Sequence, residues 1–219
     1  MSKQHLPFGI RVGTNNELLI SKEEYQELMA YAKERNVRLE NFKRFGGNIS
    51  LIKEMVDDVV AIAQDFPKLL EGKKSVIIRL EEHSSDNDFA TTNHHIISIN
   101  AKIFNNEDYL KKEYKILSDD RKFVKGTDYR SVIRHEIGHV VANIYGLCPM
   151  SIALQVMPEK KKSEIVRYVK LNISLYAADY DDGGEFMSEC FSAYYSGIDI
   201  SFTKEYIKKC KETIAKEGL

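Results

Sequence analysis

The sequence predicts an α+β protein that is mostly helical, with a small mixed sheet beside one central helix. Apolar residues recur at helical spacing in several long segments, which are separated by turn or capping residues. Only two short runs, residues 75–80 and 94–100, have the β-branched composition of strands. With 219 residues, the chain is long enough for one large domain or two small ones.

The N-terminal third is predicted to be helical. Ser21 and Glu24 have the spacing of a capping box, which begins a helix that ends near Asn36. A second helix is expected at residues 49–66, because its apolar residues lie on one face and the next residue is a proline. Residues 42–47, between the two helices, read as a turn.

These features suggest a division of the chain near residue 70. Residues 1–70 form an N-terminal helical region, which is either integral to the fold or a separate cap or docking surface. Residues 71–219 form the main domain.

The two strand candidates form the sheet. In the second, Ile97 and Ile99 face one side, because alternate strand residues share a face. His94 and His95 are adjacent and would point to opposite faces, so they read as ordinary polar positions of the strand rather than a metal-binding pair.

The remaining segments are predicted to be helical from their apolar stripes and from caps or terminating glycines. We expect helices at residues 106–117, from Thr127 or Asp128 to Gly146, and at 163–175, 185–195 and 203–216, with a loop or short helix at 149–158.

Charge and cysteine content restrict the function. The formal net charge is −1, from 32 basic and 33 acidic residues, so no broad field favours nucleic acid or an anionic membrane as a partner. Cys148, Cys190 and Cys210 are widely spaced and indicate a reduced protein. The chain shows neither an apolar secretion signal nor the ~20 apolar residues of a membrane span. We expect a protein made for the cytoplasm unless it is exported by some other route.

The segment from His135 to His139 has the pattern H-E-x-x-H. On a helix, residues four apart share a face, so both imidazoles can reach one ion. Zn²⁺ suits two histidines and one oxygen ligand, with a fourth position open to water, and Glu136 would be the general base. The alternative is an ordinary helix with two histidines four apart. Gly138 costs about 1 kcal/mol of helix stability relative to Ala, which suggests close approach of another element.

A third protein ligand is expected for zinc, and no histidine follows His139. Glu185 and Glu189 lie four apart on one predicted helix, so one can reach the ion while the other accepts the spare N–H of a ligating histidine. The alternative is that Glu185 only closes a capping box with Asp182. A Ca²⁺ site at residues 179–185 is disfavoured, because the regular D-x-D-x-D-G spacing is missing.

The H-E-I-G-H segment, followed by Tyr176-Ala177 and by the E-F-M-S-E-C-F segment at 185–191, resembles the zincin-type (gluzincin) metallopeptidases of the anthrax lethal factor group. It is also similar to zincin domains of phage head-morphogenesis proteins and related bacterial toxins. The resemblance covers roughly residues 75–200. It implies a zincin-like fold and a zinc ion held by His135, His139 and Glu185, with Glu189 as an outer carboxylate partner.

The family's tyrosine, which binds the oxyanion, falls on Tyr176. Tyr180 is a rival, because the segment between this tyrosine and the first glutamate is longer here than in the family. Ser188 replaces the family's usual alanine.

We therefore predict a zinc-dependent endopeptidase that acts on peptide or protein substrates. The alternative is a non-catalytic zincin-like module for binding or for virion or toxin assembly. The strand at 94–100 is expected to be a sheet edge that pairs with an extended substrate through Ile96, Ile97 and Ser98.

Overall fold

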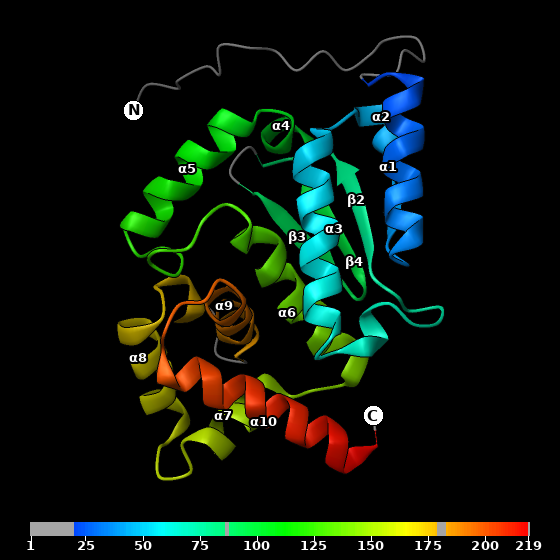
Figure 1. The fold of residues 1–219 in the computed structure, drawn as a ribbon. Helices are drawn as coiled ribbons and strands as arrows, with labels where there is room; N and C mark the ends of the chain where they lie inside the picture. The colour runs from blue at the N-terminus through cyan, green and yellow to red at the C-terminus, as the bar shows by residue number, and fades with distance from the viewer. Residues whose placement is uncertain (1–19, 86–87, 179–182, 219) are drawn as a thin grey trace.

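A computed structural model describes residues 20–85, 88–178 and 183–218 of the chain. The fold is α+β and mostly helical, with one small mixed sheet, which confirms the predicted class (Figure 1). The elements of the described residues are, in order, α1 (Lys22–Glu34), β1 (Arg38–Glu40), α2 (Phe42–Phe45), α3 (Ile49–Ala63), η1 (Pro67–Leu69), β2 (Ile77–Glu81), β3 (Ala90–Asn93), β4 (Ile96–Asn100), α4 (Ala101–Phe104), α5 (Glu107–Asp119), α6 (Ser131–Tyr145), α7 (Pro149–Val156), α8 (Lys162–Asn172), η2 (Tyr176–Ala178), α9 (Gly184–Tyr195) and α10 (Ser201–Glu217).

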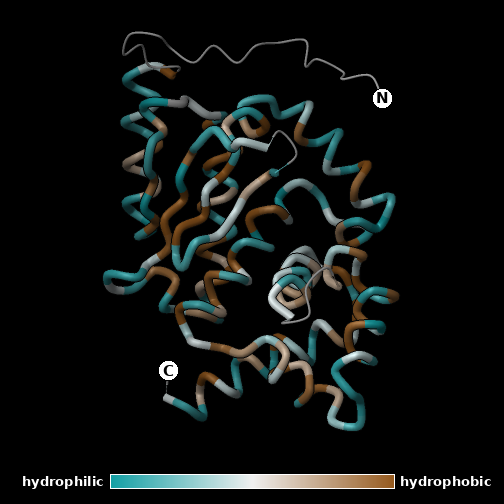
Figure 2. The backbone as a smooth tube through the Cα atoms, turned by 180° about the vertical axis from the view of Figure 1, so that it is seen from behind, coloured by the Kyte–Doolittle hydropathy of each residue, from teal (hydrophilic) through white to brown (hydrophobic). Residues whose placement is uncertain are grey.

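The sheet has the strand order β1-β2-β4-β3. β1 and β4 run parallel to β2, and β3 runs antiparallel to β4. In Figure 1, α3 lies across one face of this sheet. Apolar colour runs along the central strands β2 and β4 in Figure 2, and their buried apolar residues are Ile77, Ile78, Leu80, Ile97 and Ile99. The predicted shared face of Ile97 and Ile99 is therefore confirmed.

Two expectations about the second strand are wrong. His94 and His95 are not strand residues; they form the two-residue turn between β3 and β4, where His94 has φ of +56°. β4 is not a sheet edge, because β2 pairs with one side of it and β3 with the other. The backbone of Ile96, Ile97 and Ser98 thus has no open side for a substrate strand. The edge strand on this side of the sheet is β3.

The N-terminal region shares its sheet and core with the rest of the described chain. β1 extends the sheet by pairing with β2. Leu28 of α1 and Val56 of α3 belong to the same buried cluster as Ile133 of α6. Residues 20–70 are therefore an integral part of the fold.

Most predicted helices are present, with ends that differ by a few residues. The capping box of α1 is confirmed: the Glu24 backbone N–H donates to Ser21 Oγ at 3.1 Å, and the Ser21 N–H donates to the Glu24 carboxylate at 2.9 Å. α3 ends at Ala63, earlier than expected, and Pro67 begins η1. Residues 42–45 form the short helix α2 instead of only a turn.

The central helix α6 ends at Gly146, which is left-handed as a helix terminator requires. Its predicted start is wrong. α6 begins at Ser131 without a side-chain cap, and Asp128 accepts instead from the Arg130 backbone N–H in the turn that precedes the helix.

No single helix of the described chain is both long and apolar enough to cross a membrane. α6 and α7 reach the required length and composition only as a pair, and they are bent by 99° at their junction.

Candidate metal centre

Two helices packed against each other place the candidate ligands. His135 and His139 lie one turn apart on α6, and Glu185 lies in the first turn of α9. Gly138, between the histidines, allows this close packing: a Cβ at this position would lie 2.7 Å from the Ser188 Cα of α9. Gly138 thus lies where another helix approaches closely, as expected from the presence of a helix-destabilising residue at this position.

The three donors converge on one point. Glu185 Oε2 lies 3.2 Å from His135 Nε2 and 3.6 Å from His139 Nε2, and one ligand atom from each residue lies within 4.8 Å of the other two. Ligands at about 2.0–2.1 Å around a tetrahedral ion are separated by about 3.3 Å. Glu185 Oε2 is buried without a hydrogen-bond partner, as a ligand atom facing a cation would be. The residues therefore fit a divalent ion such as Zn²⁺.

Glu189 orients one of the histidines. Its Oε1 accepts a hydrogen bond from His135 Nδ1 at 2.8 Å, since an ionised carboxylate can only accept. This fixes the tautomer of His135 and leaves Nε2 with a lone pair for the ion. Glu189 is 1% exposed, so the pair is shielded from solvent.

The charges of the site already suit a cation. Burial opposes protonation of His135, but the carboxylates of Glu185 and Glu189 outweigh it and raise the pKa of His135 to about 10. Burial also opposes ionisation of Glu185, yet the imidazoles of His135 and His139 lower the pKa of its carboxyl to about 2. Glu185 is thus ionised at neutral pH, as a carboxylate ligand of a cation must be.

Glu136 contacts the edge strand of the sheet through its carboxylate. It is 7% exposed, and its Oε2 accepts a hydrogen bond from Thr92 Oγ1 at 2.7 Å. Thr92 belongs to the edge strand β3 and is not among the residues predicted for the site. Its only local signal is the pair of threonines before a turn, which is typical of a short hairpin strand.

Of the two tyrosines considered for the oxyanion, only Tyr176 is described. Its ring centre lies 5.6 Å from that of His135, and its backbone N–H donates to the Lys122 carbonyl at 3.0 Å. Tyr180, with the rest of the acidic loop at 179–182, lies outside the described residues. The N-cap of α9 is Gly183, which makes no side-chain hydrogen bond. Asp182, the other member of the capping box considered for Glu185, lies outside the described residues.

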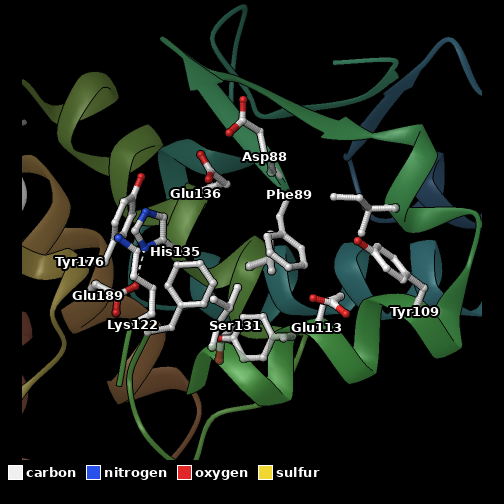
Figure 3. Close-up of a pocket in the computed structure, with 16 residues that line it drawn as sticks. Asp88, Phe89, Tyr109, Glu113, Lys122, Ser131, His135, Glu136, Tyr176 and Glu189 are labelled. Atoms are coloured by element: carbon white, nitrogen blue, oxygen red, sulfur yellow. Dashed lines mark hydrogen bonds and ion pairs between the residues drawn. The ribbon is translucent and has the colours of Figure 1, made fainter. Parts of the chain in front are cut away.

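A pocket of about 360 Å³ adjoins the centre. His135 and Glu136 lie toward one side of it, and Tyr109 and Glu113 of α5 lie on the opposite side (Figure 3). Its wall is mainly apolar, with Phe89, Ile103, Leu117, Phe123 and Val132. The pocket combines segments far apart in the chain, and for this reason sequence patterns gave no sign of it.

The chain matches no family model, no curated protein and no solved structure with which it was compared. The function of the site is therefore inferred from its own side chains.

Proposed function

We propose that this protein is a zinc-dependent endopeptidase with a zincin-like fold. The observation that carries the proposal is the convergence of His135, His139 and Glu185 within 4.8 Å, with Glu136 on the same helix. A purely structural ion has no need of an extra carboxylate, whereas hydrolysis of a peptide needs a general base near the attacking water.

In this proposal, zinc supplies Lewis-acid chemistry: it makes a water easier to deprotonate and polarises the carbonyl group of the peptide. Glu136 takes the proton from the attacking water and passes it to the leaving amine. Tyr176, whose ring lies beside that of His135, would donate a hydrogen bond to the negative oxygen that develops at the cleaved carbonyl.

The substrate would lie extended along the edge strand β3. Strand addition gives backbone hydrogen bonds to a sheet edge. Ala90 of β3 lines the pocket, as does Phe89, the residue before this strand. A large apolar side chain next to the cleaved bond would then enter this pocket.

Two variants test the proposal. Protein purified without chelators should contain zinc and cleave members of a peptide library. Glu136→Gln should keep zinc and lose hydrolysis, because the amide cannot accept the proton, whereas His139→Ala should lose both. Hydrolysis by Glu136→Gln at the wild-type rate would refute the mechanism.

Measurements on the wild-type protein distinguish the endopeptidase from the non-catalytic alternative. Protein that holds zinc but cleaves no peptide, with or without added zinc, would be a non-catalytic binding module. Protein without zinc would contradict the metal centre itself.

A further inference from the structure

The edge strand β3 presents alternate residues to its open side. The Asn100 N–H donates to the Phe89 carbonyl at 2.9 Å, so these opposed residues form a hydrogen-bonded pair. In antiparallel ladders hydrogen-bonded and non-bonded pairs alternate. The pairs of Ala90 with Ile99 and of Thr92 with Ile97 are therefore non-bonded. Consequently, the backbone N–H and C=O of Ala90 and Thr92 point away from β4, toward the edge where a substrate would pair.

The side chain of Thr92 points to the general base. Thr92 lies opposite the buried Ile97, on the sheet face that packs on the helices, whereas its neighbour Thr91 is exposed on the other face. Thr92 Oγ1 lies 2.7 Å from Glu136 Oε2 and 3.3 Å from the Glu136 carbonyl oxygen. The single hydroxyl proton of Thr92 therefore points mainly to the carboxylate oxygen, which is the nearer and the stronger acceptor of the two.

This hydrogen bond restricts the carboxylate that must move the proton. Oε2 is engaged by Thr92, and Oε1 has no hydrogen-bond partner among the described residues, so Oε1 is the oxygen available to the attacking water. A carboxylate on a flexible side chain would otherwise sample several rotamers, and the catalytic geometry tolerates only small errors.

We propose that Thr92 is a positioning residue. Its backbone pairs with the substrate at the sheet edge, and its hydroxyl holds Glu136 in the orientation that proton transfer requires. The same residue therefore aligns the cleaved bond and the base relative to each other. This inference rests on the proposed peptidase function.

The test compares side chains at position 92 in the full-length, zinc-loaded protein. Thr92→Val keeps the shape and removes the hydroxyl; we expect kcat to fall about 10- to 100-fold, the usual effect of one hydrogen bond to a charged group. KM and zinc content should change less than about twofold, because neither the backbone groups nor the ligands are altered. Thr92→Ser retains the hydroxyl and should restore kcat to within about threefold of wild type.

Thr91→Val is the matched control on the opposite face of β3 and should leave kcat unchanged. Should Thr92→Val fail to fold, Thr92→Ala and Thr92→Ser form a second pair that differs only in the hydroxyl. Equal kcat values for variants with and without the hydroxyl, while Glu136→Gln is inactive, would overturn the role of Thr92 alone. An inactive wild-type protein, or an active Glu136→Gln, would overturn the peptidase function and this inference together.

Discussion

Replacing Gly138 by alanine should push the two helices of the metal centre apart. The added Cβ would lie 2.7 Å from Ser188 Cα, 3.1 Å from Ser188 Oγ and 3.3 Å from Phe191 Cβ. Carbon atoms in good contact are about 3.5–4.0 Å apart, so α9 must shift by roughly 0.8 Å or more. The closest atom belongs to the backbone, and a change of side-chain rotamer cannot relieve the clash.

Two opposing effects set the size of the destabilisation. Overpacking of a well-packed core costs about 1–3 kcal/mol. Alanine regains about 1 kcal/mol of helix propensity relative to glycine. Because the clash involves backbone, we expect the upper part of the first range and a net loss of about 1–2 kcal/mol. For a protein of this size, this loss corresponds to a fall in Tm of about 2–8 °C. Zinc affinity should fall as well, because α9 carries Glu185 and Glu189.

Urea unfolding of the metal-free proteins measures the change in unfolding free energy. Competition with a chromophoric chelator measures the change in zinc affinity. Ser188→Ala is the control on the facing helix. Ser188 Oγ is buried without a hydrogen-bond partner, so its removal should change the unfolding free energy by less than about 0.5 kcal/mol or increase it. A Gly138→Ala variant that is more stable than wild type by the helix-propensity gain alone would refute the reasoning from close packing.

Three further predictions concern the ion. Glu189→Ala should weaken zinc binding about 10- to 100-fold, because His135 loses the partner of its Nδ1, whereas Glu113→Ala in the pocket should not; the same chelator competition compares them. Zinc affinity should rise about tenfold per pH unit between roughly pH 6 and 8, because the His135 pKa of about 10 requires that a proton leave before the ion binds. Calorimetric titrations in buffers of different ionisation enthalpy would count that proton. Zinc binding without proton release would contradict the assignment of His135 as a ligand. Chelation should lower the unfolding free energy of wild type by about 2.7 kcal/mol relative to protein at 100-fold excess of zinc over its Kd, but should leave the Tm of His139→Ala unchanged.

The helices were predictable because their signals are local. The capping box at Ser21 and the glycine at 146 mark helix ends through groups only a few residues apart. β1 and β3 were not predicted. β1 has one apolar residue among three, and β3 has no large one among four, so their strand conformation depends on pairing with β2 and β4.

The candidate ligand residues stood out from the sequence because zinc chemistry requires such residues at helical spacing in two segments. Their distances could not be predicted, since the approach of α9 to α6 depends on packing over the whole interface. Thr92 and the pocket were missed for a similar reason: 44 positions separate Thr92 from its partner Glu136. A contact of this separation leaves no periodic pattern in either segment.

The start of α6 is held by a charge from the first third of the chain. Asp58 of α3 is 5% exposed and accepts hydrogen bonds from Arg130 at 2.7 and 3.0 Å and from Arg134 at 3.0 and 3.2 Å. Deletion of the first 70 residues would remove the carboxylate of Asp58 from the guanidinium groups of Arg130 and Arg134, which lie five residues and one residue before His135. Any truncated or recombined variant of this protein that keeps the two histidines must therefore also keep Asp58 or replace it with another acidic group.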